Sequence, residues 1–151
     1  MAVMVPFLVI GMMGMLDLGR AFYYQISLTN AAREAARYGA LPYYTGLNPA
    51  CSAIPPSVTG PGASCPVPGD QKIKDRLTQE LSGTGIIVDQ TKIIIAPGEG
   101  QRVTDCGTSG SCQYALSVTV TYQFDFITPI IGDLIGNPLT LKTSSLFRTE
   151  Y

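Results

Sequence analysis

Residues 1–16 read MAVMVPFLVIGMMGML and contain no charged side chain. Residues 17–40 continue as DLGRAFYYQISLTNAAREAARYGA, where alanine and larger apolar side chains recur at steps of three and four residues. This spacing is typical of one face of an α-helix. The sequence therefore predicts one long helix at residues 1–40, with an apolar tip (1–16) and an amphipathic half (17–40). Such a helix would be about 60 Å long, more than a small domain can bury, so part of it must contact lipid or other subunits.

Proline and glycine bear on where this helix starts and stops. Pro6 would break the interior of an ordinary helix, but it is tolerated near a helix start or in a packed bundle. Glycine is favoured just past the last helical residue, and the proline at position 42 cannot easily continue a helix. We therefore expect the helix to stop at Gly39.

Three interpretations compete for the apolar tip. A cleaved signal peptide is not favoured, because the tip has neither a basic flank nor a small-x-small cleavage site. A self-sufficient transmembrane helix needs about 20 apolar residues, and this run stops at Asp17. A helix that sits in the bilayer until it is extracted, and then packs against copies of itself in a filament, fits better. The missing basic flank also suggests an upstream leader that was removed or was not included.

Five residues of the helix are candidates for packing between subunits. Gly11 and Gly14 lie one turn apart and would let helices approach closely, or they are merely tolerated in a lipid-facing segment. Asp17 and Arg20 can pair on one helix face. That pair would either set the register between neighbouring subunits or mark the membrane–water boundary. Together with Pro6, these residues are the predicted helix-packing site.

The rest of the chain, residues 41–151, is predicted to form a globular head. Its four cysteines lie in loops rich in Gly, Pro and Ser, at Cys51, Cys65, Cys106 and Cys112. An even number of cysteines in such loops indicates disulfides formed in an oxidising compartment. Three connectivities are possible, and we favour pairing sequence neighbours, because each pair then closes a local loop. A zinc site is less favoured without a C-x2-C spacing or a histidine. Tyr43 and Tyr44 could make adhesive or lateral contacts, or could cover the sheet edge.

One short helix is predicted in the head. Asp70 is its candidate N-cap, and Ile73, Leu77 and Leu81 form an apolar stripe along it. Its charged side chains are expected to face water, and they are Lys72, Lys74, Asp75, Arg76 and Glu80.

Three strands are predicted around this helix. Residues 114–126 alternate between apolar and polar over their whole length, which predicts a long strand with one buried face. Residues 86–96 are β-branched and aliphatic, with a possible kink near Asp89, and residues 139–151 return as a final strand. The predicted fold class is therefore α+β and pilin-like. Its long N-terminal helix packs on a C-terminal antiparallel β-sheet of three or four strands, with disulfide-stapled loops.

The composition argues against catalysis and against nucleic-acid binding. The chain has no histidine, which removes the commonest general base and the commonest metal ligand. No phosphate-binding loop is present, and the carboxylates are scattered. The net charge is -1 without a block of like charges, so no basic surface for nucleic acid is expected. We expect a protein that is not an enzyme and has no cofactor, no metal and no nucleic-acid partner.

Several segments carry a family resemblance. The helix contains AVMVP at residues 2–6, DLGRAFY at residues 17–23 and NAAREAARY at residues 30–38. The C-terminal part contains VTVTY at residues 118–122 and TPIIG at residues 128–132. These segments resemble the TadE-like family, pilin-like proteins of the tight-adherence (Flp) branch of type IV pilus systems. Members usually carry a glutamate shortly before the A-x-x-x-P stretch, and by register it would fall just before this sequence.

The resemblance implies a structural pilin-like subunit that assembles through its apolar helix into an extracellular type IV-like (Tad) filament involved in surface adhesion. It implies as partners copies of the same chain, other pilins and the pilus assembly machinery, with the inner membrane holding the helix before assembly. Two alternatives stay open. The chain is a minor or priming pilin, or it is an inner-membrane-anchored envelope protein that does not polymerise.

Overall fold

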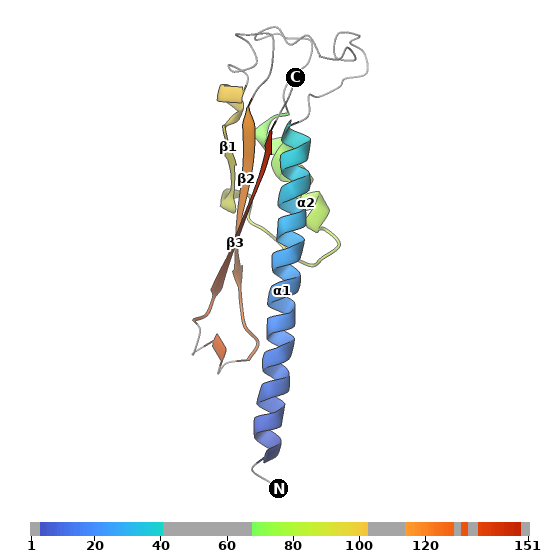
Figure 1. The fold of residues 1–151 in the computed structure, drawn as a ribbon, viewed down its shortest axis with the longest axis vertical. Helices are drawn as coiled ribbons and strands as arrows, with labels where there is room; N and C mark the ends of the chain where they lie inside the picture. Colours follow the sequence, from blue (N-terminus) through green and yellow to red (C-terminus); the bar gives the residue numbers. More distant parts are fainter. Residues whose placement is uncertain (1–3, 41–67, 103–113, 129–130, 133–135, 149–151) are drawn as a thin grey trace.

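In the computed structural model, a long helix stands beside a sheet and a shorter helix (Figure 1). The structure describes residues 4–40, 68–102, 114–128, 131–132 and 136–148. The elements in chain order are α1 (Met4–Ala40), α2 (Asp70–Leu81), the 3-10 helix η2 (Gln90–Lys92), β1 (Ile93–Ala96), β2 (Ala115–Phe124) and β3 (Leu139–Arg148). The predicted α+β architecture with a long N-terminal helix is confirmed, and the sheet has three antiparallel strands.

The core forms where the C-terminal half of α1 meets α2 and β2 (Figure 1). The helix presents mostly alanine at this contact, and alanine lets a neighbouring element approach the helix backbone closely. The apolar stripe predicted for α2 packs against it from one side, and β2 packs from the other. Side chains that are at most 2% exposed here are Leu28, Ala31, Ala32, Ala35, Ala36, Ile73, Leu77, Leu81, Leu116, Val118 and Val120.

Gly39 has a different role from the helix stop that its type suggests. α1 continues beyond it, and its φ is not positive. A Cβ atom at this position would overlap Leu116 Cδ2 and would lie 2.6 Å from Ile73 Cδ1. The Tyr114 hydroxyl also donates a hydrogen bond to the Gly39 carbonyl oxygen at 3.0 Å. The expected capping role is therefore wrong: Gly39 is the point where β2 and α2 come so close to the helix that a Cβ atom would force the buried Leu116 and Ile73 side chains to shift.

β2 is the central strand of the sheet, whose order is β1-β2-β3. β3 pairs with it from Ala115 opposite Arg148 to Phe124 opposite Leu139. The hairpin that joins β2 to β3 therefore points toward the N-terminal half of α1 (Figure 1). The predicted alternation is confirmed, since the buried side chains of β2 are Leu116, Val118, Val120 and Phe124.

β1 is shorter than the strand predicted over residues 86–96. Only Ile93–Ala96 pairs with β2, and Gln90–Lys92 forms η2 instead. The Asp89 side chain caps η2, because its Oδ1 accepts the N–H of Thr91 at 2.8 Å. Such a local hydrogen bond competes with strand pairing. In place of the expected kink within a strand, η2 ends the irregular segment before β1, so the strand is confined to the residues that follow.

Asp70 begins α2 but is not its N-cap. Gly69 is the N-cap, and the Asp70 Oδ1 atom instead makes an ion pair with Arg102 Nη1 at 2.7 Å. Asp70 and Glu99, which lie 29 residues apart, each accept the other's backbone N–H at 3.3 Å. The capping prediction is wrong, because the free N–H at the start of the helix is satisfied across the chain rather than locally.

Arg102 is fully buried. Besides its ion pair with Asp70, it donates hydrogen bonds to the carbonyl oxygens of Pro97 and Pro68, both at 2.8 Å. A buried guanidinium is tolerated only where such partners offset the loss of water. Arg102 thus ties the segment after β1 to the start of α2.

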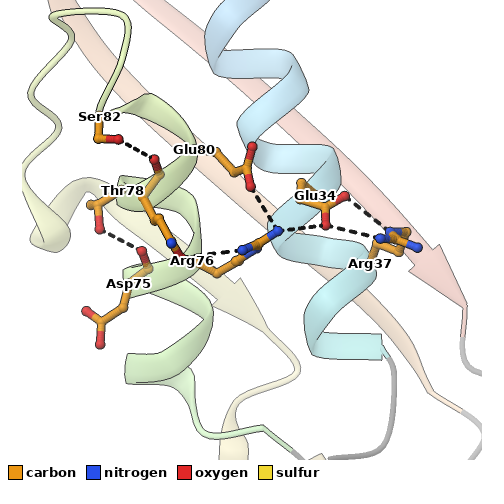
Figure 2. A network of polar contacts seen from close by, with 8 residues as sticks. Glu34, Arg37, Asp75, Arg76, Thr78, Glu80 and Ser82 are labelled. Atoms are coloured by element: carbon orange, nitrogen blue, oxygen red, sulfur yellow. Dashed lines mark hydrogen bonds and ion pairs between the residues drawn. The ribbon is translucent and has the colours of Figure 1, made fainter.

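Arg76 links α2 to α1 (Figure 2). Its Nη2 lies 3.0 Å from Glu80 Oε1 on α2 and 3.3 Å from Glu34 Oε1 on α1. Glu34 also accepts a hydrogen bond from Arg37 Nε at 3.2 Å. The bond from Arg37 is the main cause that lowers the pKa of Glu34 below its ordinary value; partial burial opposes it, and the bond from Arg76 adds to it. The expectation that Arg76 simply faces water is wrong, because its partner comes from the other helix.

Candidate functional site: the helix tip and the Asp17 junction

The apolar tip of α1 is largely exposed. Among the described residues, α1 is the one helix that is long and apolar enough to cross a membrane by length and composition. Only 6% of its most apolar stretch is buried within the subunit, so this stretch is not the core of the head. An apolar surface of this extent requires lipid or another protein chain to cover it. The exposed side chains of the tip are Met4, Val5, Phe7, Leu8, Val9, Ile10, Met12, Met13, Met15 and Leu16.

Asp17 marks the place where the subunit starts to cover α1. The residue is only 2% exposed, and its Oδ2 accepts the N–H of Thr128 at 2.8 Å. Its Oδ1 accepts the N–H of Ile127 at 3.3 Å and a hydrogen bond from Arg20 Nη1 at 3.2 Å. The Asp17–Arg20 ion pair expected from the spacing is therefore present. Three N–H donors converge on one carboxylate, which stabilises its ionised form because an ionised carboxylate is purely an acceptor.

The end of the β2–β3 hairpin is shaped to present these amides. The Thr128 carbonyl oxygen accepts the N–H groups of Ile131 and Gly132, at 3.2 and 3.3 Å, which closes a helical turn. The Asn137 side chain accepts the N–H of Phe126 at 3.4 Å. The N–H groups of Phe126, Ile131 and Gly132 are therefore bonded within the hairpin. The N–H groups of Ile127 and Thr128 instead point at α1 and bind Asp17.

Arg20 also packs on aromatic rings. Its guanidinium carbon lies 5.3 Å from the ring centroid of Phe124 and 5.9 Å from that of Tyr24. Tyr24 meets Phe124 and Tyr122 edge to face, with ring centroids 5.4 and 5.7 Å apart. Cation–π and edge-to-face contacts of this kind are favourable. They hold Arg20 against the sheet, while its side chain stays 39% exposed, so a role of the pair between subunits stays a prediction.

The two candidate glycines are not equivalent. A Cβ atom on Gly14 would lie 2.8 Å from Ile131 Cδ1 at the end of the hairpin. A Cβ atom on Gly11 would have no other atom of the described subunit within 4 Å. Gly14 therefore serves contact within the subunit, whereas Gly11 leaves its face of the helix open to an external neighbour.

A shallow groove lies between α1 and the hairpin end. Its volume is about 250 Å³, and its walls are mainly apolar. The residues that line it are Met13, Leu16, Asp17, Arg20, Ile127 and Thr128.

Several predicted site residues are placed elsewhere or not described. Pro6 lies in the first turn of α1 as described, where proline is tolerated. Tyr43, Tyr44 and all four cysteines (Cys51, Cys65, Cys106 and Cys112) lie outside the described residues, so the disulfides stay a prediction.

The hairpin residues that hold Asp17 were not foreseen from the sequence. Ile127 and Thr128 act through their backbone N–H groups, which every residue except proline carries, so residue type gives no signal. A glycine inside a helix, such as Gly14, indicates that another part of the protein approaches the helix closely. The sequence does not show that this part is Ile131. Within the described ranges, no group of three or more Cys, Asp or Glu side chains could hold a metal ion. The absence of catalysis stays a prediction.

Comparison with known proteins gives a match at the helix. Residues 1–37 match the family described as TadE-like protein, which confirms the resemblance for nearly all of α1 and leaves the head unmatched. No curated protein and no solved structure is significantly similar to the chain. The family match and the exposed apolar helix fit a membrane-anchored protein associated with Tad pili and their assembly machinery.

Proposed function

Because residues 1–37 match the TadE-like family, we propose that this chain is a structural pilin-like subunit. Its N-terminal helix assembles it into an extracellular type IV-like (Tad) filament that serves surface adhesion. The observation that carries the proposal is the division of α1 into a covered and an exposed part. The head covers one face of α1 from Asp17 onward, and the apolar tip before Asp17 is largely exposed in the described subunit, although Gly14 lies against Ile131.

The exposed apolar tip of α1 is suited to two successive environments. It sits in the inner membrane before assembly, and it packs against the helices of other copies and of other pilins afterwards. Neither environment exposes its apolar side chains to water. Gly11 supports the second step, because the absence of nearby atoms leaves room for a neighbouring helix to approach closely.

In this proposal the heads form the outside of the filament. The Cys51–Cys65 and Cys106–Cys112 pairs would stabilise their loops, and Tyr43, Tyr44 and the Cys51–Cys65 loop would together make adhesive contacts. Deletion of the loop between Cys51 and Cys65 should then abolish attachment and leave filaments intact. Loss of the filaments themselves would instead assign the loop to assembly.

The decisive experiment is electron microscopy of the material sheared from the cell surface, with mass spectrometry to quantify this chain in the same fraction. We expect the wild-type chain to dominate fibres of uniform diameter. Gly11→Leu should abolish the fibres, because leucine blocks close approach of helices at a position where a Cβ atom has no described atom of the subunit within 4 Å. Gly11→Ala is the matched control and should assemble. Normal assembly of Gly11→Leu would contradict the proposal.

The exposed apolar tip of α1 is also compatible with two alternative functions. A minor or priming pilin would be present in trace amounts in the fibres, and an inner-membrane-anchored envelope protein would stay with the membrane and be absent from them. In both alternatives the same apolar side chains would anchor α1. The amount of this chain in the sheared fraction therefore distinguishes either alternative from a main filament subunit. A membrane-anchored protein that does not polymerise should tolerate Gly11→Leu.

A further inference from the structure

The apolar tip alone is too short to cross a bilayer. Residues 1–16 rise about 24 Å as a helix, whereas the hydrocarbon core of a bilayer is about 30 Å thick. Asp17 follows directly, and a carboxylate that faces lipid is costly. If the proposed membrane stage is correct, something must extend the apolar surface and shield this charge.

The β2–β3 hairpin shields Asp17. The Asp17 carboxylate accepts the backbone N–H groups of Ile127 and Thr128, and Asp17 is only 2% exposed. The opposite face of α1 remains apolar past this point, because Phe22 and Ile26 are 61% and 60% exposed. From Met4 the helix rises about 27 Å to Phe22 and about 33 Å to Ile26, which brackets the thickness of the hydrocarbon core.

The end of the hairpin adds apolar surface at the same level. Ile127 is 69% exposed, and it lines the groove against the tip of α1. Ile131 packs on Gly14, so the hairpin end lies directly beside the apolar helix. Asp125 is exposed and precedes this end, so we place the polar limit of the surface between Asp125 and Phe126.

Side chains typical of a membrane interface surround the junction. Tyr23 is 50% exposed, the partly buried ring of Tyr24 lies beside it, and the partly buried ring of Tyr122 lies beside Tyr24. Arg20 lies within this group, with its guanidinium on the Tyr24 ring. Tyrosine is enriched at the headgroup level of membranes, and a long arginine side chain can keep its charge there. This level on α1 agrees with the upper limit obtained from the helix length.

We propose that the end of the β2–β3 hairpin, at Phe126–Thr128 and Ile131, enters the bilayer beside α1. The membrane-embedded part of the subunit is then α1 from Met4 to about Tyr23 together with this hairpin end. Lipid is the occupant of the exposed surface at Ile127, because Ile127 lines the same mainly apolar groove as Met13 and Leu16 of the tip. The inference rests on the proposed membrane stage of α1 and adds a second lipid-contacting element to it.

A tryptophan scan tests the inference, because the chain contains no tryptophan. Ile127→Trp in the full chain, reconstituted in phosphatidylcholine vesicles, gives a single probe at the hairpin end. Leu8→Trp is the positive control in the tip. Ile94→Trp is the matched negative control, because Ile94 is likewise an exposed isoleucine and pairs opposite Thr119, about 17 Å along β2 from Phe124, where the strand ends before residue 127. Fluorescence is measured with and without lipids brominated on their acyl chains, and with acrylamide as the aqueous quencher.

We expect brominated lipid to quench Ile127→Trp nearly as strongly as Leu8→Trp, while Ile94→Trp is quenched by acrylamide alone. Quenching of Ile127→Trp by acrylamide but not by brominated lipid would overturn the inference and leave the membrane anchor intact. Protection of Ile127→Trp from both quenchers would also overturn it, because a second protein chain would then cover the site. If Leu8→Trp escapes the brominated lipid as well, the membrane stage of the proposed function fails.

Discussion

Asp17 and Thr128 lie 111 residues apart in the sequence, yet the Thr128 N–H donates to Asp17 Oδ2 at 2.8 Å. This hydrogen bond joins the first charged residue of α1 to the end of the β2–β3 hairpin. It divides the helix into the part that the subunit covers and the part that it leaves bare. Both proposals depend on this boundary, so the junction is the first place to test.

Asp17→Asn should loosen the hairpin end. Asparagine keeps one acceptor oxygen, so one of the two N–H groups at residues 127 and 128 loses its partner. A buried donor without a partner costs about 1–3 kcal/mol. Amide hydrogen exchange of Thr128 in detergent micelles should therefore accelerate, by roughly tenfold for each 1.4 kcal/mol.

Asp89→Asn is the matched control for this variant. Asp89 also accepts a backbone N–H, from Thr91 at 2.8 Å, but it does so at an exposed position where water can replace it. We expect little change in the exchange of Thr128 or in overall stability. Unchanged exchange of Thr128 in Asp17→Asn would show that the hairpin is held by its apolar contacts alone.

Gly39→Ala should destabilise the head. The added methyl group would overlap Leu116 and crowd Ile73, and overpacking of this kind costs about 1–3 kcal/mol. Gly19→Ala is the control on the same helix, because a Cβ atom there meets none of the described atoms beyond its own helix within 4 Å. It should stabilise the helix by about 0.5–1 kcal/mol, as alanine does in a helix interior. Thermal unfolding in micelles should thus move in opposite directions, and equal shifts would refute the close-approach role of Gly39.

The sequence predicts this fold wherever a repeated local pattern decides it. The helix and the alternation in β2 follow from spacing alone, because burial of one face imposes a period on the chain. Arg102 and the Arg76–Glu34 pair could not be predicted, because their partners come from segments distant in the sequence. The Asp17–Arg20 pair was predictable as neighbours on a helix turn. The amides that complete its environment were not, because backbone N–H groups carry no residue signature.

Lowering the pH should weaken the contact between α1 and α2. Glu34 lies in the part of α1 that packs on α2, outside the proposed membrane-embedded part, and the hydrogen bond from Arg37 is the main cause that lowers its pKa below 4.5. A lowered folded-state pKa contributes stability above the unfolded-state value, and this stability is lost as the pH falls through the folded-state pKa. The melting temperature should therefore decline in acid below the ordinary pKa of glutamate.

Glu34→Gln isolates this contribution. The variant should be less stable than the wild type at neutral pH, because Arg76 and Arg37 lose a charged partner. Its melting temperature should decline less in acid, because the titrating group is gone. Other carboxylates titrate in both proteins, so the difference between the two curves is the relevant quantity. Parallel curves would assign the acid sensitivity to those other groups.

Gly14→Leu and Gly11→Leu should both prevent filament assembly, but for different reasons. A leucine at position 14 collides with Ile131 and pushes the hairpin end away from α1, so Thr128 exchange should accelerate as it does in Asp17→Asn. A Cβ atom at position 11 has no described atom of its own subunit within 4 Å, so Thr128 exchange in Gly11→Leu should stay at the wild-type rate. Hydrogen exchange combined with electron microscopy separates the two effects. If Gly14→Leu left the exchange of Thr128 unchanged, Ile131 would have room to move aside, and Gly14 would be available to a neighbouring subunit in the same way as Gly11.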